Sequence, residues 1–181
     1  MVVSAIFVLL SSVVLAGNSR FGSVIVLQNL AHDIGLSVRQ AQVYGIAVRR
    51  YDNPSAPGAP GVFTHSYGMH FSPGTSYELF ADVNGNGIWE PGETVDPITL
   101  RGGYAITDIC APSTTCGVSR VDIVFRRPEP DACISTGGTI TYDLNGVCTA
   151  AAVQRAIITI ASPRGDQAEV LIDASGQISV R

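Results

Sequence analysis

Residues 1–16, MVVSAIFVLLSSVVLA, carry no charged side chain, and serines are their only polar residues. Such a run avoids water, and a helix in a membrane tolerates serine. The run is shorter than the ~20 residues that a membrane-spanning helix needs, and no Lys or Arg precedes it as in a secretory signal. We therefore expect the membrane-spanning half of a helix over about residues 1–18, with Met1 inside a longer natural segment.

After Gly17 the pattern becomes that of an amphipathic helix, with apolar residues at steps of three and four. The buried stripe of this helix, which is also the candidate face for assembly with other subunits, is Phe21, Val24, Leu27, Ala31, Ile34, Val38 and Ala41. Because no linker separates the halves, we expect one helix over residues 1–49, on the order of 70 Å long at ~1.5 Å per residue. A cleaved signal peptide followed by a separate helix is the alternative.

Beyond Arg50, short apolar runs bounded by turn residues replace the helical period. Residues 51–61, rich in Pro and Gly, are expected to form a loop. The predicted strands are residues 62–67, 77–82, 94–100, 119–125, 138–144, 156–162, 168–173 and 177–181. They would form one or two antiparallel sheets, and residues 149–155 are a candidate short helix. The predicted organisation is a helix over residues 1–49 and an extracytoplasmic β-rich head over residues 50–181.

Four cysteines lie in the C-terminal half, without a CxxC pair or a histidine at zinc-ligand spacing. An even number in an exported β-rich domain indicates two disulfides. We favour pairing between sequence neighbours, Cys110 with Cys116 and Cys133 with Cys148, because such pairs close short loops. Buried free thiols and, more remotely, a zinc site are the alternatives.

Residues 82–93, DVNGNGIWEPGE, form the sharpest chemical motif. Calcium binds about six to eight oxygen atoms, and the spacing of the acidic and amide side chains follows the order of an EF-hand loop. The predicted ligands are Asp82, Asn84, Asn86, the carbonyl of Ile88, Glu90 and Glu93. The flanking segments look like strands and Asn-Gly occurs twice, so a β-hairpin without an ion is the alternative. A structural calcium ion is therefore the candidate cofactor, and no other cofactor is predicted.

Other patterns favour structural roles. His65, Met69 and His70 could form a soft-metal site, but isolated histidines on strands are more often surface residues. The Arg-Gly-Asp tripeptide at 164–166 lies between two predicted strands and is expected to be a turn. No nucleophile elbow, phosphate loop or HExxH motif occurs, so no catalytic residue and no small-molecule substrate are predicted. The net charge of −4, without a Lys/Arg cluster, argues against nucleic acid as a partner.

The opening residues resemble the segment after the processing motif of bacterial type IV pilins and type II secretion pseudopilins, where Gly-Phe-Thr-Leu-Ile-Glu leads into an apolar run. The processing Gly, the methylated Phe and the Glu of that motif are absent from this sequence. Three further stretches are similar to the GspH/FimT group of minor pseudopilins: Leu30, Val38, Arg39, Ala41, Gly45 and Val48; then YELFADVNGNGIWEPGE; then AEVLIDASGQISVR.

The resemblance implies a pilin-like α+β fold, in which a long N-terminal helix with a transmembrane half and an amphipathic half packs on an antiparallel β-sheet head. It also implies a non-catalytic minor pilin or pseudopilin subunit of a filament that serves pilus assembly, secretion or DNA uptake. Its partners would be the membrane and other pilin subunits, in the cytoplasmic membrane and then at the cell surface or in the periplasm. The alternative is an exported or membrane-anchored, calcium-stabilised β-domain that binds a ligand without polymerising.

Overall fold

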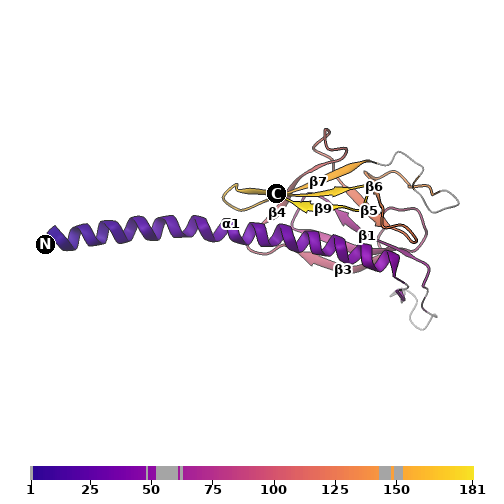
Figure 1. The fold of residues 1–181 in the computed structure, drawn as a ribbon, viewed down its shortest axis with the longest axis horizontal. Coiled ribbons are helices and arrows are strands. Elements are labelled where there is room, and N and C mark those ends of the chain that lie inside the picture. The colour runs from indigo at the N-terminus through magenta and orange to yellow at the C-terminus, as the bar shows by residue number, and fades with distance from the viewer. Residues whose placement is uncertain (1, 48, 52–60, 62, 143–147, 149–152) are drawn as a thin grey trace.

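The computed structural model describes residues 2–47, 49–51, 61, 63–142, 148 and 153–181, and the side chains of all of these except residues 13–21. Helix α1 (Val2–Ile46) projects at its N-terminal end from a head of β structure (Figure 1). The strands in the described residues are β1 (Ser66–Phe71), β2 (Ser76–Asp82), β3 (Thr94–Thr99), β4 (Ala105–Cys110), β5 (Val121–Phe125), β6 (Ala132–Ser135), β7 (Arg155–Ala161), β8 (Gln167–Asp173) and β9 (Ile178–Val180).

Helix α1 contains no proline, so no position in it lacks a backbone donor or clashes with the preceding turn. Serines inside it bond back to the carbonyls of the preceding turn: Ser12 Oγ donates to Leu9 O at 2.8 Å, and Ser37 Oγ donates to Asp33 O at 2.9 Å. These bonds satisfy polar side chains without interrupting the helix.

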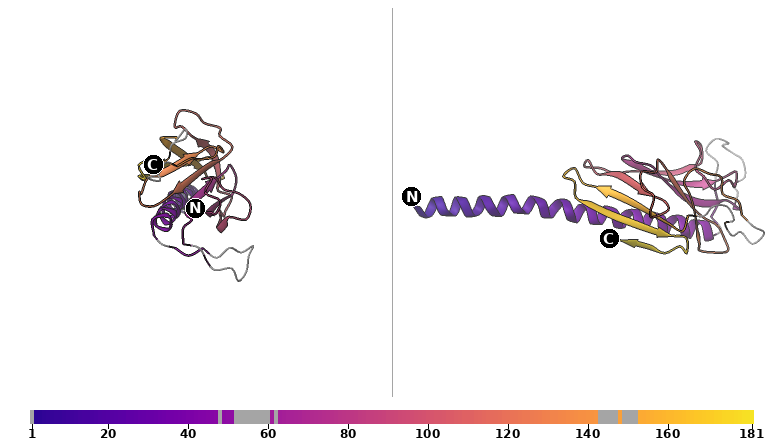
Figure 2. Two further views of the ribbon diagram at one scale, coloured as in Figure 1. Left: turned by 90° about the vertical axis from the view of Figure 1, so that its right-hand side faces the viewer. Right: turned by 90° about the horizontal axis from the view of Figure 1, so that it is seen from above.

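The strands form two antiparallel sheets, which Figure 2 shows on one flank of α1. The first sheet has the order β3-β2-β1-β5-β6 and the second has the order β4-β7-β8-β9. Backbone bonds between Gly74 and Ile106, at 2.8 and 2.9 Å, join the turn after β1 to β4 and so connect the two sheets.

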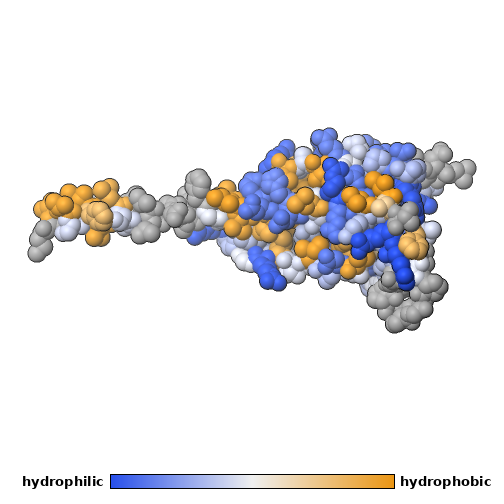
Figure 3. All heavy atoms as spheres, turned by 60° about the horizontal axis from the view of Figure 1, so that its bottom comes forward, coloured by the Kyte–Doolittle hydropathy of each residue, from blue (hydrophilic) through white to orange (hydrophobic). Residues whose placement is uncertain are grey.

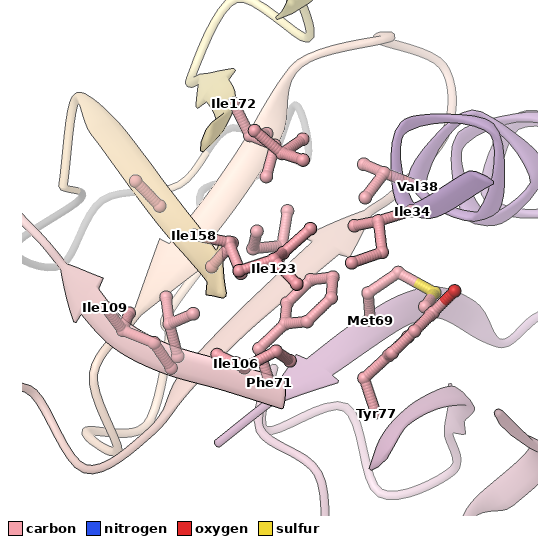
Figure 4. Packing of buried hydrophobic residues seen from close by; sticks show 14 of the residues in the cluster. Ile34, Val38, Met69, Phe71, Tyr77, Ile106, Ile109, Ile123, Ile158 and Ile172 are labelled. Carbon is pink, nitrogen blue, oxygen red and sulfur yellow. The ribbon is translucent and has the colours of Figure 1, made fainter. Parts of the chain in front are cut away.

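The core lies where the two sheets and α1 meet. Buried residues of one cluster come from α1, from β1 and β5 of the first sheet, and from β4, β7 and β8 of the second. Figure 4 shows Ile34 and Val38 of α1 pointing toward this cluster, near Met69, Ile123 and Ile172. The helix therefore closes one side of the space between the sheets, and it removes its own apolar stripe from water in doing so.

Hydrogen bonds hold α1 in the head at two places. Near the point where the helix leaves the head, Tyr104 Oη donates to Ser23 O at 3.2 Å, and Ser23 Oγ donates to Asp166 Oδ2 at 3.3 Å. Near its C-terminal end, Gln42 Nε2 donates to Pro130 O at 2.8 Å. The direction of α1 relative to the sheets is thus fixed from both ends.

Most predicted strands are confirmed within a few residues: β2, β3, β5, β7, β8 and β9 coincide with them. The strand predicted over 62–67 is displaced, because β1 spans Ser66–Phe71. Residues 138–142 form no strand beyond an isolated bridge between Tyr142 and Cys148. Residues 52–60 and 149–152, part of the predicted loop and of the predicted short helix, lie outside the described residues, and Arg155 belongs to β7.

Strands β4 and β6 were not predicted. A register shift between Ile106 and Asp108 breaks the alternation of β4, and β6 is only four residues long. Since sequence reasoning looks for regular alternation over several residues, both strands give a weak signal.

The predicted fold class is wrong. The head is not a single antiparallel sheet that carries a helix with a transmembrane half. In the described residues nine strands form two sheets, and these enclose the core between them. In addition, no helix in the described part of the chain has the length and apolar character needed to cross a membrane. The prediction failed because it placed the core between the helix and the face of a sheet, whereas the two sheets and the helix enclose the core together.

The close approach of α1 to β5 gives a stability prediction. A Cβ atom at Gly45 would overlap the backbone carbonyl of Phe125, whereas one at Gly22 would meet no atom within 4 Å. We expect Gly45→Ala to lower the free energy of unfolding by about 1–3 kcal/mol through overpacking. Gly22→Ala should raise it by up to ~1 kcal/mol, because alanine favours the helix. Denaturant unfolding of both variants checks this, and equal effects of the two substitutions would contradict the packing described.

Candidate functional site

The predicted calcium loop, residues 82–93, connects β2 to β3. It lies against a small apolar cluster of Phe80, Val124, Cys133 and Ile140, on which Trp89 of the loop packs. This cluster is separate from the main core. The loop is therefore an ordered cap on the first sheet, and a short two-residue hairpin turn does not describe it.

Asp82 anchors the start of the loop. Its side chain is 2% exposed, and its carboxylate accepts backbone hydrogen bonds from Gly85 at 2.9 Å and Gly87 at 3.1 Å. Gly87 has φ +72°, and a Cβ atom there would collide with the side chain of Ile140. Glycine is thus required at this position both for its backbone conformation and for its close packing.

Glu93 anchors the end of the loop in the same way. It is 6% exposed, and its two carboxylate oxygens accept hydrogen bonds from the backbone N–H groups of Val83 and Glu90, each at 3.0 Å. The two buried carboxylates therefore tie the loop at both ends through charge-assisted hydrogen bonds.

The remaining predicted ligands bond to one another. Asn84 Oδ1 accepts from Asn86 N at 3.0 Å, and Asn86 Oδ1 accepts from Ile88 N at 2.9 Å. The Nδ2 groups of both asparagines donate to the carboxylate of Glu90 at 3.0 Å. The structure thus brings all six predicted residues into one hydrogen-bonded loop.

Burial makes the two anchoring carboxylates electrostatically costly. It raises the pKa of Asp82 above the ordinary value of 3.8, although backbone hydrogen bonds and the charge of Arg126 oppose the rise. Burial also raises the pKa of Glu93 above 4.5, and the charge of Asp82 adds to that rise. A cation that both carboxylates could reach would relieve this repulsion.

The donor chemistry of the loop suits calcium, but its carboxylates do not converge on one point. Within the described residues, the group of acidic, His and Cys side chains with ligand atoms within 4.8 Å of one another is Asp108, Cys110 and Cys116. Those cysteines form a disulfide, so they are not thiolate ligands. Since the loop is already closed by its own hydrogen bonds, calcium binding would need its carboxylates to move together, and it stays a prediction.

A second polar group, which the sequence did not reveal, lies beside the loop and is called the His70 cluster: His70, Trp89, Arg120 and Asp122. His70 Nδ1 is 2.7 Å from Asp122 Oδ1, and the Trp89 ring stacks on His70 with centroids 4.5 Å apart. Arg120 donates to Asp122 Oδ2 through Nε at 3.0 Å and Nη2 at 2.5 Å, and Nη2 also donates to Trp89 O at 3.0 Å.

The His70 cluster fastens the loop to the sheet. Asp122 is fully buried and is neutralised by Arg120, while Trp89 covers the ring of His70. A hydroxyl is near the cluster, because Ser135 pairs with Asp122 across β5 and β6, but its Oγ donates to Gly138 O. Ser135 and His70 also lie on opposite sides of Asp122, because β6 and β1 flank β5. The order needed for a Ser-His-Asp triad is therefore not present here.

Both predicted disulfides are confirmed, Cys110 with Cys116 and Cys133 with Cys148. Free thiols and a zinc site at these residues are therefore excluded. The predicted turn at 164–166 is also confirmed, and Asp166 Oδ2 is bonded to Ser23 and Ser162. Met69 lies in the core while His70 lies in the cluster just described, so the soft-metal group is not assembled.

The predicted assembly stripe on α1 lies mostly inside the subunit. Val24 is 43% exposed, and the side chain of Phe21 is outside the described ones. The rest of the stripe is buried against the head: Leu27, Ala31, Ile34, Val38 and Ala41. Figure 3 shows that exposed apolar side chains gather instead at the projecting end of α1. They are Val2, Val3, Ile6, Phe7, Val8, Leu9 and Leu10.

Trp89 of the loop is the only tryptophan of the chain, so its fluorescence provides a probe for calcium binding. If the predicted ligands bind calcium, we expect its emission to change saturably, with a Kd of about 0.1–1 mM as in extracellular calcium modules. The free energy of unfolding should rise by about 1–3 kcal/mol at calcium concentrations well above the Kd. Glu90→Gln, which keeps the size of an exposed side chain, should weaken the response. No response to calcium at about 10 mM would show that the loop is a turn without an ion.

The raised pKa values give a pH prediction in the absence of calcium. Between the ordinary and the raised pKa, the folded chain binds more protons than the unfolded chain, so the free energy of unfolding falls as pH rises. Gln at position 93 does not titrate. We therefore expect Glu93→Gln to destabilise the protein less at pH ~7 than at pH ~4. Denaturant unfolding across this range in EDTA measures the trend, with Glu129→Gln at an exposed position as control; the opposite slope would refute it.

Comparisons with protein-family models, with curated proteins and with solved structures give no match.

Proposed function

We propose that the chain is a non-catalytic filament subunit of the type IV pilin and pseudopilin class, in which α1 packs against the α1 helices of neighbouring subunits. The observation that carries this proposal is the apolar surface of the projecting part of α1. The side chains of Val2, Phe7 and Leu10 are 73%, 73% and 62% exposed, and no residue from 2 to 19 is charged.

The physical reason is the free energy of that exposed surface. Each Å² of apolar area removed from water contributes roughly 25 cal/mol, and the exposed residues include the unbroken run 6–10, which covers all sides of the helix. An all-apolar helix needs cover all round, which one flat partner surface does not provide. Several parallel helices around each α1 would provide it.

A further apolar surface favours assembly over a plain anchor. Along the part of α1 that lies in the head, further apolar side chains are exposed: Val24, Ile25, Val26, Val43 and Ile46. An anchor would need apolar residues only where it is embedded. A filament subunit needs them also beside the head, where neighbouring subunits meet.

The location proposed with this function is an extracytoplasmic head at the bacterial cytoplasmic membrane or in a filament beyond it. The two disulfides support it, since such bonds persist in oxidising compartments. The non-catalytic character is supported by the His70 cluster, whose polar atoms bond to one another under the cover of Trp89. A minor subunit is preferred because of the sequence resemblance to the GspH/FimT group.

The test compares two phenylalanines. Phe7→Glu places a charge on the projecting helix, and Phe63→Glu makes the same change at a head position that is 47% exposed. We expect Phe7→Glu to abolish incorporation into filaments sheared from the producing cells, because burying an unpaired carboxylate among helices costs several kcal/mol. Phe63→Glu should leave incorporation intact.

Cross-linking provides a second readout in the same cells. A cysteine introduced as Leu9→Cys should form disulfide-linked species with other subunits, since all four native cysteines are paired. A chain that stays monomeric and membrane-associated in both experiments would overturn filament assembly and favour the binding-module alternative.

A further inference from the structure

The two sheets have four outer strands in the described residues: β3, β6, β4 and β9. An outer strand presents backbone N–H and C=O groups that pair readily with another extended chain, unless something blocks them. Which of these edges is open decides where a partner strand can add.

Strands β4 and β6 are covered by other parts of the chain. Ile106 of β4 exchanges both backbone bonds with Gly74. On β6, Ala132 N donates to Ala174 O at 2.8 Å and Ile134 O accepts from Val153 N at 3.4 Å. These groups are not available to a partner.

Strand β3 is blocked by a proline. Leu100 N donates to Thr75 O at 2.7 Å. Because hydrogen-bonded positions alternate along an antiparallel pair, the backbone N–H at position 97, three residues earlier, would point away from β2. This position is occupied by Pro97. Proline has no N–H, and it is a common protection of strand edges.

Strand β9 has no such protection. Glu169 and Arg181 exchange two backbone bonds, at 2.8 and 3.0 Å, and Asp173 N donates to Gln177 O at 2.9 Å. By the same alternation, the N–H and C=O groups of Ile178 and Val180 point away from β8. In the part of the chain that the structure describes, no partner for these groups is found.

The open edge lies beside α1 and faces a groove of about 350 Å³. The right view of Figure 2 shows β9 next to the helix, and β9 is the last strand of its sheet. The groove is lined by His32, Gly35, Leu36, Arg39, Ile178, Ser179 and Val180. Leu36 is 67% exposed, so an added strand would both pair with β9 and cover this leucine.

The charge of the groove selects the partner. None of its lining residues is acidic, and Arg39 and His32 stand along the helix side, although the chain as a whole has a net charge of −4. Arg39 is an exposed residue, and its Nη1 donates to Gln42 Oε1. A carboxylate on an added strand would gain a charge-assisted bond there, whereas a basic strand would be repelled.

We propose that β9 binds an extended, acidic segment of another protein as an added strand, with an apolar residue on Leu36 and a carboxylate at Arg39. A second copy of this chain is disfavoured as the occupant, because both described outer strands that carry an acidic residue are blocked, β3 by Pro97 and β4 by Gly74. The inference does not depend on filament assembly, since the groove is separate from the projecting end of α1.

The probe is an end-blocked, fluorescein-labelled peptide of alternating valine and glutamate, titrated with the full chain in a mild non-ionic detergent. Fluorescence anisotropy should show saturable binding, which Arg39→Glu weakens about tenfold or more. Arg101→Glu, the same change at an exposed arginine outside the groove, should alter the affinity by less than about twofold. The matched valine–lysine peptide should bind about tenfold or more weakly than the acidic one.

Val180→Pro tests the pairing of β9 with the added strand, because it removes a backbone N–H that points away from β8 and is not bonded to it. We expect it to weaken the acidic peptide about tenfold or more, while Val180→Thr, which keeps the N–H, retains binding. Equal binding of the acidic peptide to the wild-type, Arg39→Glu and Val180→Pro chains would overturn the proposal, as would the absence of saturable binding. Self-association in the ultracentrifuge that Val180→Pro abolishes would assign the edge to a second copy and would equally overturn it.

Discussion

The burial of one stripe of α1 between the two sheets is the interaction on which the rest of the structure depends. Leu27, Ala31, Ile34, Val38 and Ala41 supply the helix side of a core that both sheets complete. Without this stripe the space between the two sheets would be open to water on one side, and without the sheets the helix would expose apolar residues. The same contact leaves β9 beside the helix and leaves the first residues of α1 outside the head.

Polar interactions organise the opposite, outer face of the first sheet. There the buried carboxylates of Asp82 and Glu93 close the loop through backbone donors, and Asp122 is matched by Arg120. Trp89 belongs to both arrangements, because its ring stacks on His70 while its carbonyl accepts from Arg120. Each buried charge has a partner, which is the condition under which such groups are tolerated in a folded chain.

Local patterns in the sequence predicted the extent of α1, most strands and the disulfide pairing, because these depend on residues close together in the chain. Strands β4 and β6 were missed, since β4 is irregular and β6 is short. The His70 cluster depends on the pairing of β1 with β5, across about fifty residues, and no local signal marks it. The loop residues were correctly grouped, but the backbone donors that occupy Asp82 and Glu93 were visible only once the chain was folded.

The attachment of α1 to the head also has a mechanical side. The buried stripe runs along the helix axis, and the bonds of Ser23 and Gln42 lie near its two ends. A pulling force applied to the projecting end along that axis would load these contacts together, in shear, because sliding the helix disturbs all of them at once. A force across the axis would instead peel the helix away one turn at a time, so the head resists tension best in the direction in which α1 points.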